Sequence, residues 1–174
     1  AVVNDSRFPT DGSEYTDEQI KGILSRFSFP KNIEIKRYED FKELIDIISS
    51  KIKSGCIVGW FQGKMEFGER ALGNRSILGD PRSINTKDKV NAAVKYREFY
   101  RPFAPAILAE NAQDYFDIPE GVEVPFMEQV YMIKEEKRKE IPAVTHYDGT
   151  GRLQTVTKET NKLFYELIKQ FYLL

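Results

Sequence analysis

The sequence predicts an α/β fold of the α+β kind, in which helices pack on a twisted mixed sheet. Apolar residues recur at helical spacing in two segments, residues 40–53 and 158–171. Short apolar or alternating segments, such as residues 56–61, 106–109 and 152–156, are typical of strands. Because the two kinds of segment alternate along the chain, a mixed layer is favoured over an all-helical or an all-β domain.

The first elements are predicted from local signals. Thr16 and Gln19 have the spacing of a capping box, which predicts a helix that begins there and that Pro30 ends. Residues 33–37 alternate like a brief strand. The helix expected at 40–53 then leads to the apolar strand.

Beyond this strand, short strands and helices are expected to alternate up to the final helix. The charged segment 134–140 is interpreted as the solvated turn of a hairpin. The expected elements are strands at 76–79, 106–109, 126–133, 141–145 and 152–156, and helices from 85 or 86 to about 96, at 110–116 and from 158.

The composition is that of one globular domain, with 41% hydrophobic residues and a formal net charge of -1. This near-neutral charge predicts no broad basic face, which argues against a nucleic-acid partner. No stretch is long and apolar enough to span a bilayer. The single cysteine, Cys56, excludes an internal disulfide framework and favours a reducing, cytoplasmic location. Since it falls in the apolar run 56–61, we interpret it as inert packing.

Residues 1–15 carry no periodicity and are interpreted as a linker from a missing N-terminal domain, and residues 16–174 as one partial domain. The sequence begins without methionine, and its last amphipathic stretch has no helix-stop signal. We therefore expect the sequence to be a piece of a longer polypeptide.

The clearest functional pattern is a glycine-rich run over residues 59–82. Glycines allow close approach of the backbone to a ligand, and arginine forks suit phosphate or carboxylate oxygens. The run has neither the Gly-Lys-Ser/Thr ending of a Walker A loop nor the glycine spacing of a Rossmann turn. The residues alone therefore leave open an anion cradle and an irregular structural loop. Its glycines are Gly59, Gly63, Gly68, Gly73 and Gly79.

Several cations lie in segments that are otherwise apolar or turn-like, and partly buried arginines need partners. Acidic residues such as Glu66, Glu98 and Asp148 are one possible source of partners, and a bound polyanion such as a nucleotide is the other. The cations are Arg70, Arg75, Lys95, Arg97, Arg101 and Arg152.

His146 is the only histidine, which excludes a histidine-rich metal site in this chain. An isolated histidine is more often a hydrogen-bonded turn residue than a catalyst. Asp148 is likewise more often a turn former than a base. The residues alone do not decide between these roles and a place in a binding site.

Four ordered motifs resemble the O-carbamoyltransferase family, which includes the nodulation-factor and antibiotic carbamoyltransferases. The similarity runs from about residue 16 to the end of the chain. The matching motifs are QGKMEFGERALGNRSIL at 62–78, Asn91 with VKYRE at 94–98 and RPFAP at 101–105, PFM at 125–127, and IPAVTHYDGT at 141–150 with Arg152 and QTV at 154–156.

The resemblance implies a YrdC-like domain, incomplete at its C-terminus, that binds ATP with Mg²⁺. Carbamoyl phosphate would yield carbamate, which reacts with ATP to form carbamoyl-adenylate and release pyrophosphate. The carbamoyl group would then pass to a hydroxyl of a small-molecule acceptor. The resemblance also implies contact with a missing ASKHA-type domain that holds a metal ion and the acceptor. No metal site and no membrane partner are expected for this chain.

By the same resemblance, Lys95, Arg97 and Arg101 are expected to be catalytic cations that hold the triphosphate and the carbamoyl-adenylate phosphate. Glu66 is expected to orient an arginine, and His146 and Asp148 are expected to line the pocket. The full set assigned to substrate or nucleotide binding is Glu66, Arg70, Asn74, Arg75, Ser76, His146, Asp148 and Arg152.

The chain departs from the family at Glu69, where many relatives have proline, and it stops before an Asn-Thr-Ser-Phe-Asn block that follows the final helix in relatives. We therefore expect this piece to be unable to complete carbamoyl transfer. Two other interpretations stay open. One is a non-catalytic YrdC-like module that binds nucleotide or RNA, and the other is a structural piece whose arginines pair only internally.

Overall fold

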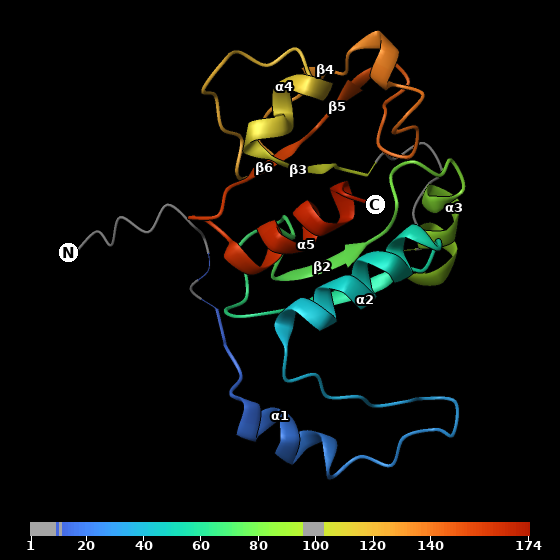
Figure 1. Ribbon diagram of the computed structural model, residues 1–174, viewed down its shortest axis with the longest axis vertical. Helices are drawn as coiled ribbons and strands as arrows, with labels where there is room; N and C mark the ends of the chain where they lie inside the picture. The colour runs from blue at the N-terminus through green and yellow to red at the C-terminus, as the bar shows by residue number, and fades with distance from the viewer. Residues whose placement is uncertain (1–9, 11, 96–102) are drawn as a thin grey trace, which may run out of the picture.

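The computed structural model describes residues 10, 12–95 and 103–174. Helices and short strands follow one another along the chain, which confirms the mixed α+β class (Figure 1). Figure 1 shows an arm, residues 12–40, below a middle part built on α2 (Phe41–Lys53) and α5 (Lys162–Tyr172). The described strands form three two-stranded sheets, one parallel and two antiparallel, instead of one mixed sheet. No helix in the described ranges is long and apolar enough to cross a membrane.

The arm carries α1 (Asp17–Leu24), which begins with the predicted capping box. The Thr16 hydroxyl accepts a hydrogen bond from the Gln19 amide at 3.2 Å, and the Gln19 side chain accepts one from the Thr16 amide at 2.9 Å. The two bonds satisfy amides that the first turn of a helix leaves without partners. The helix ends at Leu24, well before the predicted limit at Pro30.

The strand predicted at 33–37 is wrong. Its alternating residues, Ile33 and Ile35, are both exposed, and no strand is assigned to this segment. Alternation predicts a strand only where a neighbouring strand completes the hydrogen bonds, and no described strand lies beside this segment.

Helix α2 begins where it was predicted to begin because Asp40 caps it. The Oδ1 of Asp40 accepts a hydrogen bond from the Lys42 amide at 2.8 Å. One face of the helix carries the buried Ile45 and Ile52 and turns toward α5. Just after the helix, Gly55 has a φ of 85°, the left-handed conformation that glycine adopts most easily.

The strands β1 (Val58–Phe61) and β2 (Arg75–Leu78) flank the glycine-rich segment as predicted. They pair antiparallel, with Trp60 opposite Ser76. Residues 62–74 are therefore the connection of a β-hairpin, and we call them the hairpin loop.

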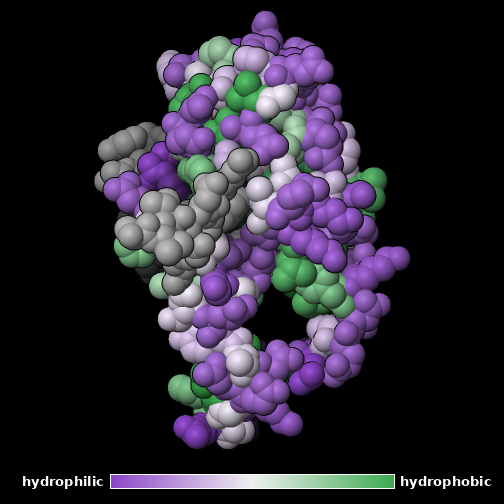
Figure 2. All heavy atoms as spheres, turned by 90° about the vertical axis from the view of Figure 1, so that its left-hand side faces the viewer, coloured by the Kyte–Doolittle hydropathy of each residue, from purple (hydrophilic) through white to green (hydrophobic). Residues whose placement is uncertain are grey.

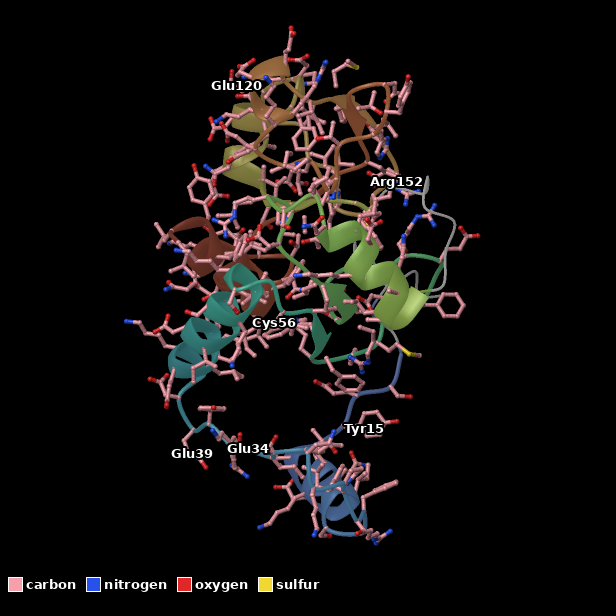
Figure 3. All side chains as sticks on the ribbon, turned by 90° about the vertical axis from the view of Figure 1, so that its right-hand side faces the viewer. Tyr15, Glu34, Glu39, Cys56, Glu120 and Arg152 are labelled. Carbon is pink, nitrogen blue, oxygen red and sulfur yellow. The ribbon has the colours of Figure 1, made fainter. Side chains whose placement is uncertain are left out.

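Cys56 lies just before β1 and is exposed, so the interpretation of Cys56 as inert packing is wrong (Figure 3). Its Sγ lies 3.6 Å from the Oγ of Ser54. The apolar run in the sequence begins two residues before β1, so Cys56 lies outside the strand.

The helix predicted at about 86–96 is divided in two. The first turn and a half is α3 (Thr86–Val90), and the following residues, Asn91–Lys95, are π-helical. Thr86 and Val90 are the buried positions of α3. This helix lies to the right of the middle part in Figure 1.

The upper part of the molecule contains β6 (Gln154–Val156), which pairs in parallel with β3 (Ala106–Leu108). All three residues of β6 are buried, so this strand lies inside the molecule. The predicted short helix after β3 consists of a 3-10 turn, Ala109–Asn111, and of α4 (Ala112–Tyr115).

The hairpin predicted across the charged segment 134–140 is wrong. The strand β4 (Tyr131–Met132) pairs antiparallel with β5 (Thr150–Gly151) instead. The segment expected to be the second strand forms turns, in which the Thr145 hydroxyl donates to the carbonyl of Ile141 at 2.9 Å. A side chain that bonds to nearby backbone in this way competes with strand formation.

Helix α5 begins later than predicted because Asn161 caps it. The Oδ1 of Asn161 accepts a hydrogen bond from the Phe164 amide at 3.1 Å. Before the helix, the hydroxyls of Thr157 and Thr160 lie 3.0 Å apart in a hydrogen-bonded turn. Local side-chain bonds therefore set the start of the helix.

Two clusters of buried apolar side chains form the core. The middle cluster joins α2, β1 and α5, and the upper cluster surrounds Phe116 and Ile133. Leu153 belongs to the upper cluster and Val156 to the middle one. The segment that contains β6 therefore connects the two clusters.

Gly73 allows a test of how closely the hairpin loop packs on α5. Its φ is 104°, and a Cβ at this position would lie 2.4 Å from the Cδ1 of Phe164. We expect Gly73→Ala to lower the free energy of unfolding by about 3 kcal/mol, because backbone strain and overpacking add. Urea denaturation of the two proteins measures the difference.

Gly68→Ala is the matched control, because Gly68 also has a positive φ, 137°, but nothing lies within 4 Å of the added Cβ. This substitution should cost about 1 kcal/mol, from strain alone. Equal losses of stability in the two variants would contradict the close contact between Gly73 and Phe164.

Candidate functional site

The carboxylate of Glu66 lies at the centre of the hairpin loop. Its Oε1 accepts hydrogen bonds from the backbone amides of Leu72 at 2.8 Å, Asn74 at 2.7 Å and Arg75 at 3.2 Å. Glu66 is only 9% exposed, and hydrogen bonds to a charged acceptor are stronger than neutral ones. These bonds offset the cost of burying the carboxylate and hold the turn over residues 72–75.

This geometry bears on the interpretation of the glycine-rich run. Among the described residues, the hydrogen bonds of Glu66 come from main-chain amides, and its expected role in orienting an arginine stays a prediction. The amide of Gly73 donates to the Oγ of Ser76 at 2.9 Å. The amides of residues 72–75 are thus all bonded to side chains of the protein. They do not form the anion cradle that one interpretation of the run predicted.

Arg75 fastens the hairpin loop through main-chain carbonyls. Its guanidinium carbon lies 3.5 Å from the centroid of the Phe61 ring, a cation–π contact. Nη1 and Nη2 each donate two hydrogen bonds, so the guanidinium is engaged within the protein. The acceptors are the carbonyls of Gln62 (2.7 Å), Asn74 (2.9 Å), Ser13 (3.1 Å) and Gly63 (3.0 Å).

Asn74 connects the hairpin loop to α5. Its Oδ1 accepts from Gln62 Nε2 at 3.1 Å and from Asn161 Nδ2 at 2.9 Å. Its Nδ2 donates to the carbonyl of Lys64 at 2.7 Å. Sequence reasoning missed Gln62 and Asn161. An asparagine just before the apolar stripe of the last helix is an N-cap signal that would have located Asn161.

Arg70 is the residue of the predicted loop set that faces solvent. Its Nη1 lies 3.6 Å from the Oε2 of Glu69, and its side chain is 41% exposed. An exposed pair of this kind contributes little to stability. Asn74, Arg75 and Ser76 are engaged within the protein, which leaves Arg70 as the loop side chain best placed to meet a ligand.

His146 and Asp148 belong to one hydrogen-bonded turn, as one interpretation of the sequence predicted. Asp148 Oδ1 accepts from the Thr150 amide at 3.0 Å and from the Thr150 hydroxyl at 2.7 Å. The single proton of this hydroxyl goes to Asp148, so the hydroxyl accepts from His146 Nδ1, which lies 2.9 Å away. The lone pair of His146 is therefore on Nε2.

The surroundings of His146 favour its neutral form. Burial lowers its pKa from the ordinary 6.5, Asp148 opposes this effect, and the charges of Arg152 and Lys87 lower the pKa further. Hydrogen bonds from Thr150 lower the pKa of Asp148. Because the folded chain binds a proton at His146 less readily than the unfolded chain does, this group stabilises the fold above pH 6.5. That contribution is lost progressively as the pH falls below 6.5.

The charges that act on His146 show which predicted residues come together. Arg152, labelled in Figure 3, lies near this turn together with Lys87 of α3. Lys87 was not predicted, because it lies among other charged residues of a short helix and has no distinguishing sequence signal. His146 therefore feels one cation from the neighbouring segment, Arg152, and one from a distant part of the chain, Lys87.

The three residues predicted to be catalytic lie at or beyond the limit of the described residues. Lys95 ends the π-helical turn, and its side chain lies outside the described part. Arg97 and Arg101 lie outside the described residues. Within the described ranges, no group of three histidine, cysteine, aspartate or glutamate residues could hold a metal ion.

An apolar cavity of about 180 Å³ lies between β2, α3 and α5. Its lining includes Val90, Phe103 and Leu167. None of the predicted site residues that the structure describes lines it. Such a lining suits an apolar group better than a phosphate, so this cavity is not the predicted anion site.

Comparison with known proteins decides the family. The profile described as "Carbamoyltransferase C-terminus" matches residues 49–174. The chain belongs to this family. The O-carbamoyltransferase resemblance of the four motifs is thereby confirmed at the level of the family.

Named proteins match this carbamoyltransferase C-terminal chain over most of its length. Nodulation protein NolNO of Sinorhizobium fredii is 49% identical over 141 residues, 80% of this chain and 20% of that protein. The 3'-hydroxymethylcephem-O-carbamoyltransferase of Streptomyces clavuligerus is 41% identical over 124 residues, 71% of this chain and 23% of that enzyme. Uncharacterized protein sll1178 of Synechocystis sp. is 39% identical over 178 residues, 92% of this chain and 28% of that protein. The chain thus spans between 20% and 28% of the length of these relatives.

The single histidine of this carbamoyltransferase chain makes its titration easy to follow by NMR. We expect the His146 pKa to lie below 6.5 and to rise in Lys87→Ala, because that substitution removes a positive charge from its surroundings. Lys89→Ala, on the same helix, is the control and should leave the pKa unchanged. A midpoint at or above 6.5, or an unchanged midpoint in Lys87→Ala, would contradict the described environment.

Proposed function

We propose that this domain takes part in the formation of carbamoyl-adenylate for transfer to a hydroxylated small molecule. Membership of the carbamoyltransferase C-terminus family supports the proposal. The name of the Streptomyces relative describes transfer of a carbamoyl group to a hydroxymethyl oxygen. The reaction of the whole polypeptide, its substrates and its partners are proposals for this chain.

The proposed reaction has three steps. Carbamoyl phosphate and water give carbamate and inorganic phosphate. A carbamate oxygen then attacks the α-phosphorus of ATP, and the bond to pyrophosphate breaks. The acceptor hydroxyl finally attacks the carbamoyl carbon, loses its proton and displaces AMP. Carbamate, inorganic phosphate and pyrophosphate carry negative charge, which cations must stabilise.

The parallel pairing of β3 and β6 is the observation that most favours a shared phosphate site. This register sets Ala106 opposite Gln154, and the Gln154 amide donates to the carbonyl of Pro105 at 2.8 Å. Arg152, two residues before Gln154, therefore lies beside the chain just before Ala106. We propose that a phosphate binds at this edge, next to Arg152.

We assign Lys95, Arg97 and Arg101 to the triphosphate and to the phosphate of carbamoyl-adenylate, with Arg152 as a second fork. Neutral His146 offers its Nε2 lone pair as an acceptor at the same edge. The hairpin loop is proposed as a wall of the pocket, from which Arg70 reaches the ligand. Mg²⁺ is proposed to enter with the phosphates of ATP.

The acceptor and a further metal ion are proposed to bind to an ASKHA-type domain of the longer polypeptide. The relatives' additional length leaves room for such a domain. A single cysteine, Cys56, suits a reducing compartment, and we place the reaction in the cytoplasm on that ground.

Pyrophosphate exchange tests the proposed adenylate directly. In the full-length protein, Arg97→Ala and Arg101→Ala should each lower carbamoyl-phosphate-dependent exchange of labelled pyrophosphate into ATP by roughly 100-fold, because each removes a cation that stabilises the departing pyrophosphate. The exposed Lys139 lies in the charged segment 134–140, to which no role in the site is assigned, and Lys139→Glu should change the rate by less than about twofold.

Failure of the folded, unsubstituted full-length protein to exchange pyrophosphate would count against the adenylate. Exchange that both alanine variants retain in full would keep the adenylate but remove the assignment of the two arginines.

A further inference from the structure

The arm presents an apolar face that nothing in the described chain covers. No residue of α1 is buried, although its apolar positions share one side of the helix. Figure 2 shows open space between the arm and the rest of the molecule. Several large apolar side chains of the arm are between 36% and 64% exposed, among them Ile20, Ile23, Leu24, Phe27, Ile33 and Ile35.

This exposure is not that of an unstructured tail. The capping box at Thr16 and Gln19 specifies where α1 begins, and Phe27 and Phe29 pack ring against ring with centroids 6.1 Å apart. Arg37 of the returning segment also forms an exposed ion pair with Asp17 of the helix, at 3.7 Å. A formed helix with its apolar side toward water is typical of a surface that is buried in a larger assembly.

The root of the arm is bonded to the hairpin loop. The amide of Gly12 donates to the carbonyl of Met65 at 3.1 Å, and the Met65 amide donates to the carbonyl of Ser13 at the same distance. Tyr15, labelled in Figure 3, has its ring 6.0 Å from that of Phe61. Whatever holds the arm therefore also positions the hairpin loop.

The relatives have additional chain that is available to cover the face. The family profile begins at residue 49, beyond the arm, so the arm lies outside the family match. The Synechocystis relative nevertheless aligns over 92% of the 174 residues. An unaligned 8% at the start of the chain would end before α1, so the alignment extends into the arm. That relative has more than two thirds of its length outside the alignment, enough chain to hold a partner surface.

Charge argues against other occupants. Acidic and basic residues are nearly balanced along residues 12–40. An interfacial membrane helix usually has a basic polar face, whereas the polar side of α1 starts with Asp17 and Glu18. A nucleic-acid partner would likewise need an excess of basic charge.

We propose that the apolar face of the arm docks on another domain of the same, longer polypeptide and couples that domain to the hairpin loop. The contact is intramolecular, and its core consists of the α1 side chains together with the returning segment around Ile33 and Ile35. This inference rests on the exposed face and on the length of the relatives. It holds or fails independently of the reaction proposed above.

Thiol labelling of the full-length polypeptide tests the contact. Ile23→Cys puts a thiol on the apolar face, and Glu18→Cys puts one on the opposite side of the same helix. With a maleimide probe and peptide mass spectrometry, the thiol introduced by Ile23→Cys should react roughly tenfold more slowly than the control thiol. Because Ile23→Cys itself trims the contact, hydrogen exchange of the α1 amides in the unsubstituted polypeptide provides the second measurement and should show protection.

Protection at both measurements that does not change on dilution supports docking within one polypeptide. Equal labelling rates at the two positions, with unprotected α1 amides, would overturn the proposal. Protection that disappears on dilution would also overturn it, because the occupant would then be a second copy.

Discussion

A carboxylate removed from water needs several strong donors, and Glu66 finds three of them in the amides of Leu72, Asn74 and Arg75. The rest of the hairpin loop depends on this arrangement. Once the turn is held, Arg75 donates to carbonyls at both ends of the loop, Gln62 and Asn74, and to the carbonyl of Ser13 in the arm. The Asn74 side chain reaches Asn161, the cap of α5. One acceptor thus positions contacts to the arm, to the loop and to the last helix.

This constraint changes how the glycine-rich run serves the proposed reaction. Amides that are bonded to Glu66 are not donors for a phosphate, so the run is better suited to a rigid wall than to a phosphate grip. The cations for the phosphates are then expected from the segment around Arg97 and Arg101 and from Arg152. The parallel register of β3 and β6 sets Ala106 opposite Gln154, which follows Arg152 by two residues. A rigid wall also has a use, since preorganised sites avoid the cost of ordering during reaction.

Much of the fold could be predicted from local signals. The capping box at Thr16, the apolar stripe of α2 and the paired strands around the hairpin loop all lie where periodicity and capping residues indicated. The strand at 33–37 and the hairpin at 134–140 were wrong because strand pairing depends on distant partners. In this chain β4 pairs with β5 and not with its expected neighbour. Pairing of that kind has no signature within a short window.

The candidate site was predictable by residue type but not by role. Polar residues at Glu66, Asn74 and Ser76 correctly marked the loop as unusual, yet their bonds are to the protein itself. Sequence cannot distinguish a carboxylate that pairs with an arginine from one that collects amides, because the second case depends on the path of the backbone. Lys87 was missed for a similar reason, since only the folded chain brings α3 beside His146.

Amide hydrogen exchange at Leu72, Asn74 and Arg75, compared between the unsubstituted chain and Glu66→Ala, tests the central claim most directly. We predict that these amides are protected in the unsubstituted chain and exchange roughly tenfold or more faster in the variant, while the amides of α2 keep their rates. Unprotected amides in the unsubstituted chain, or equal rates in the two proteins, would contradict a loop that is held by Glu66.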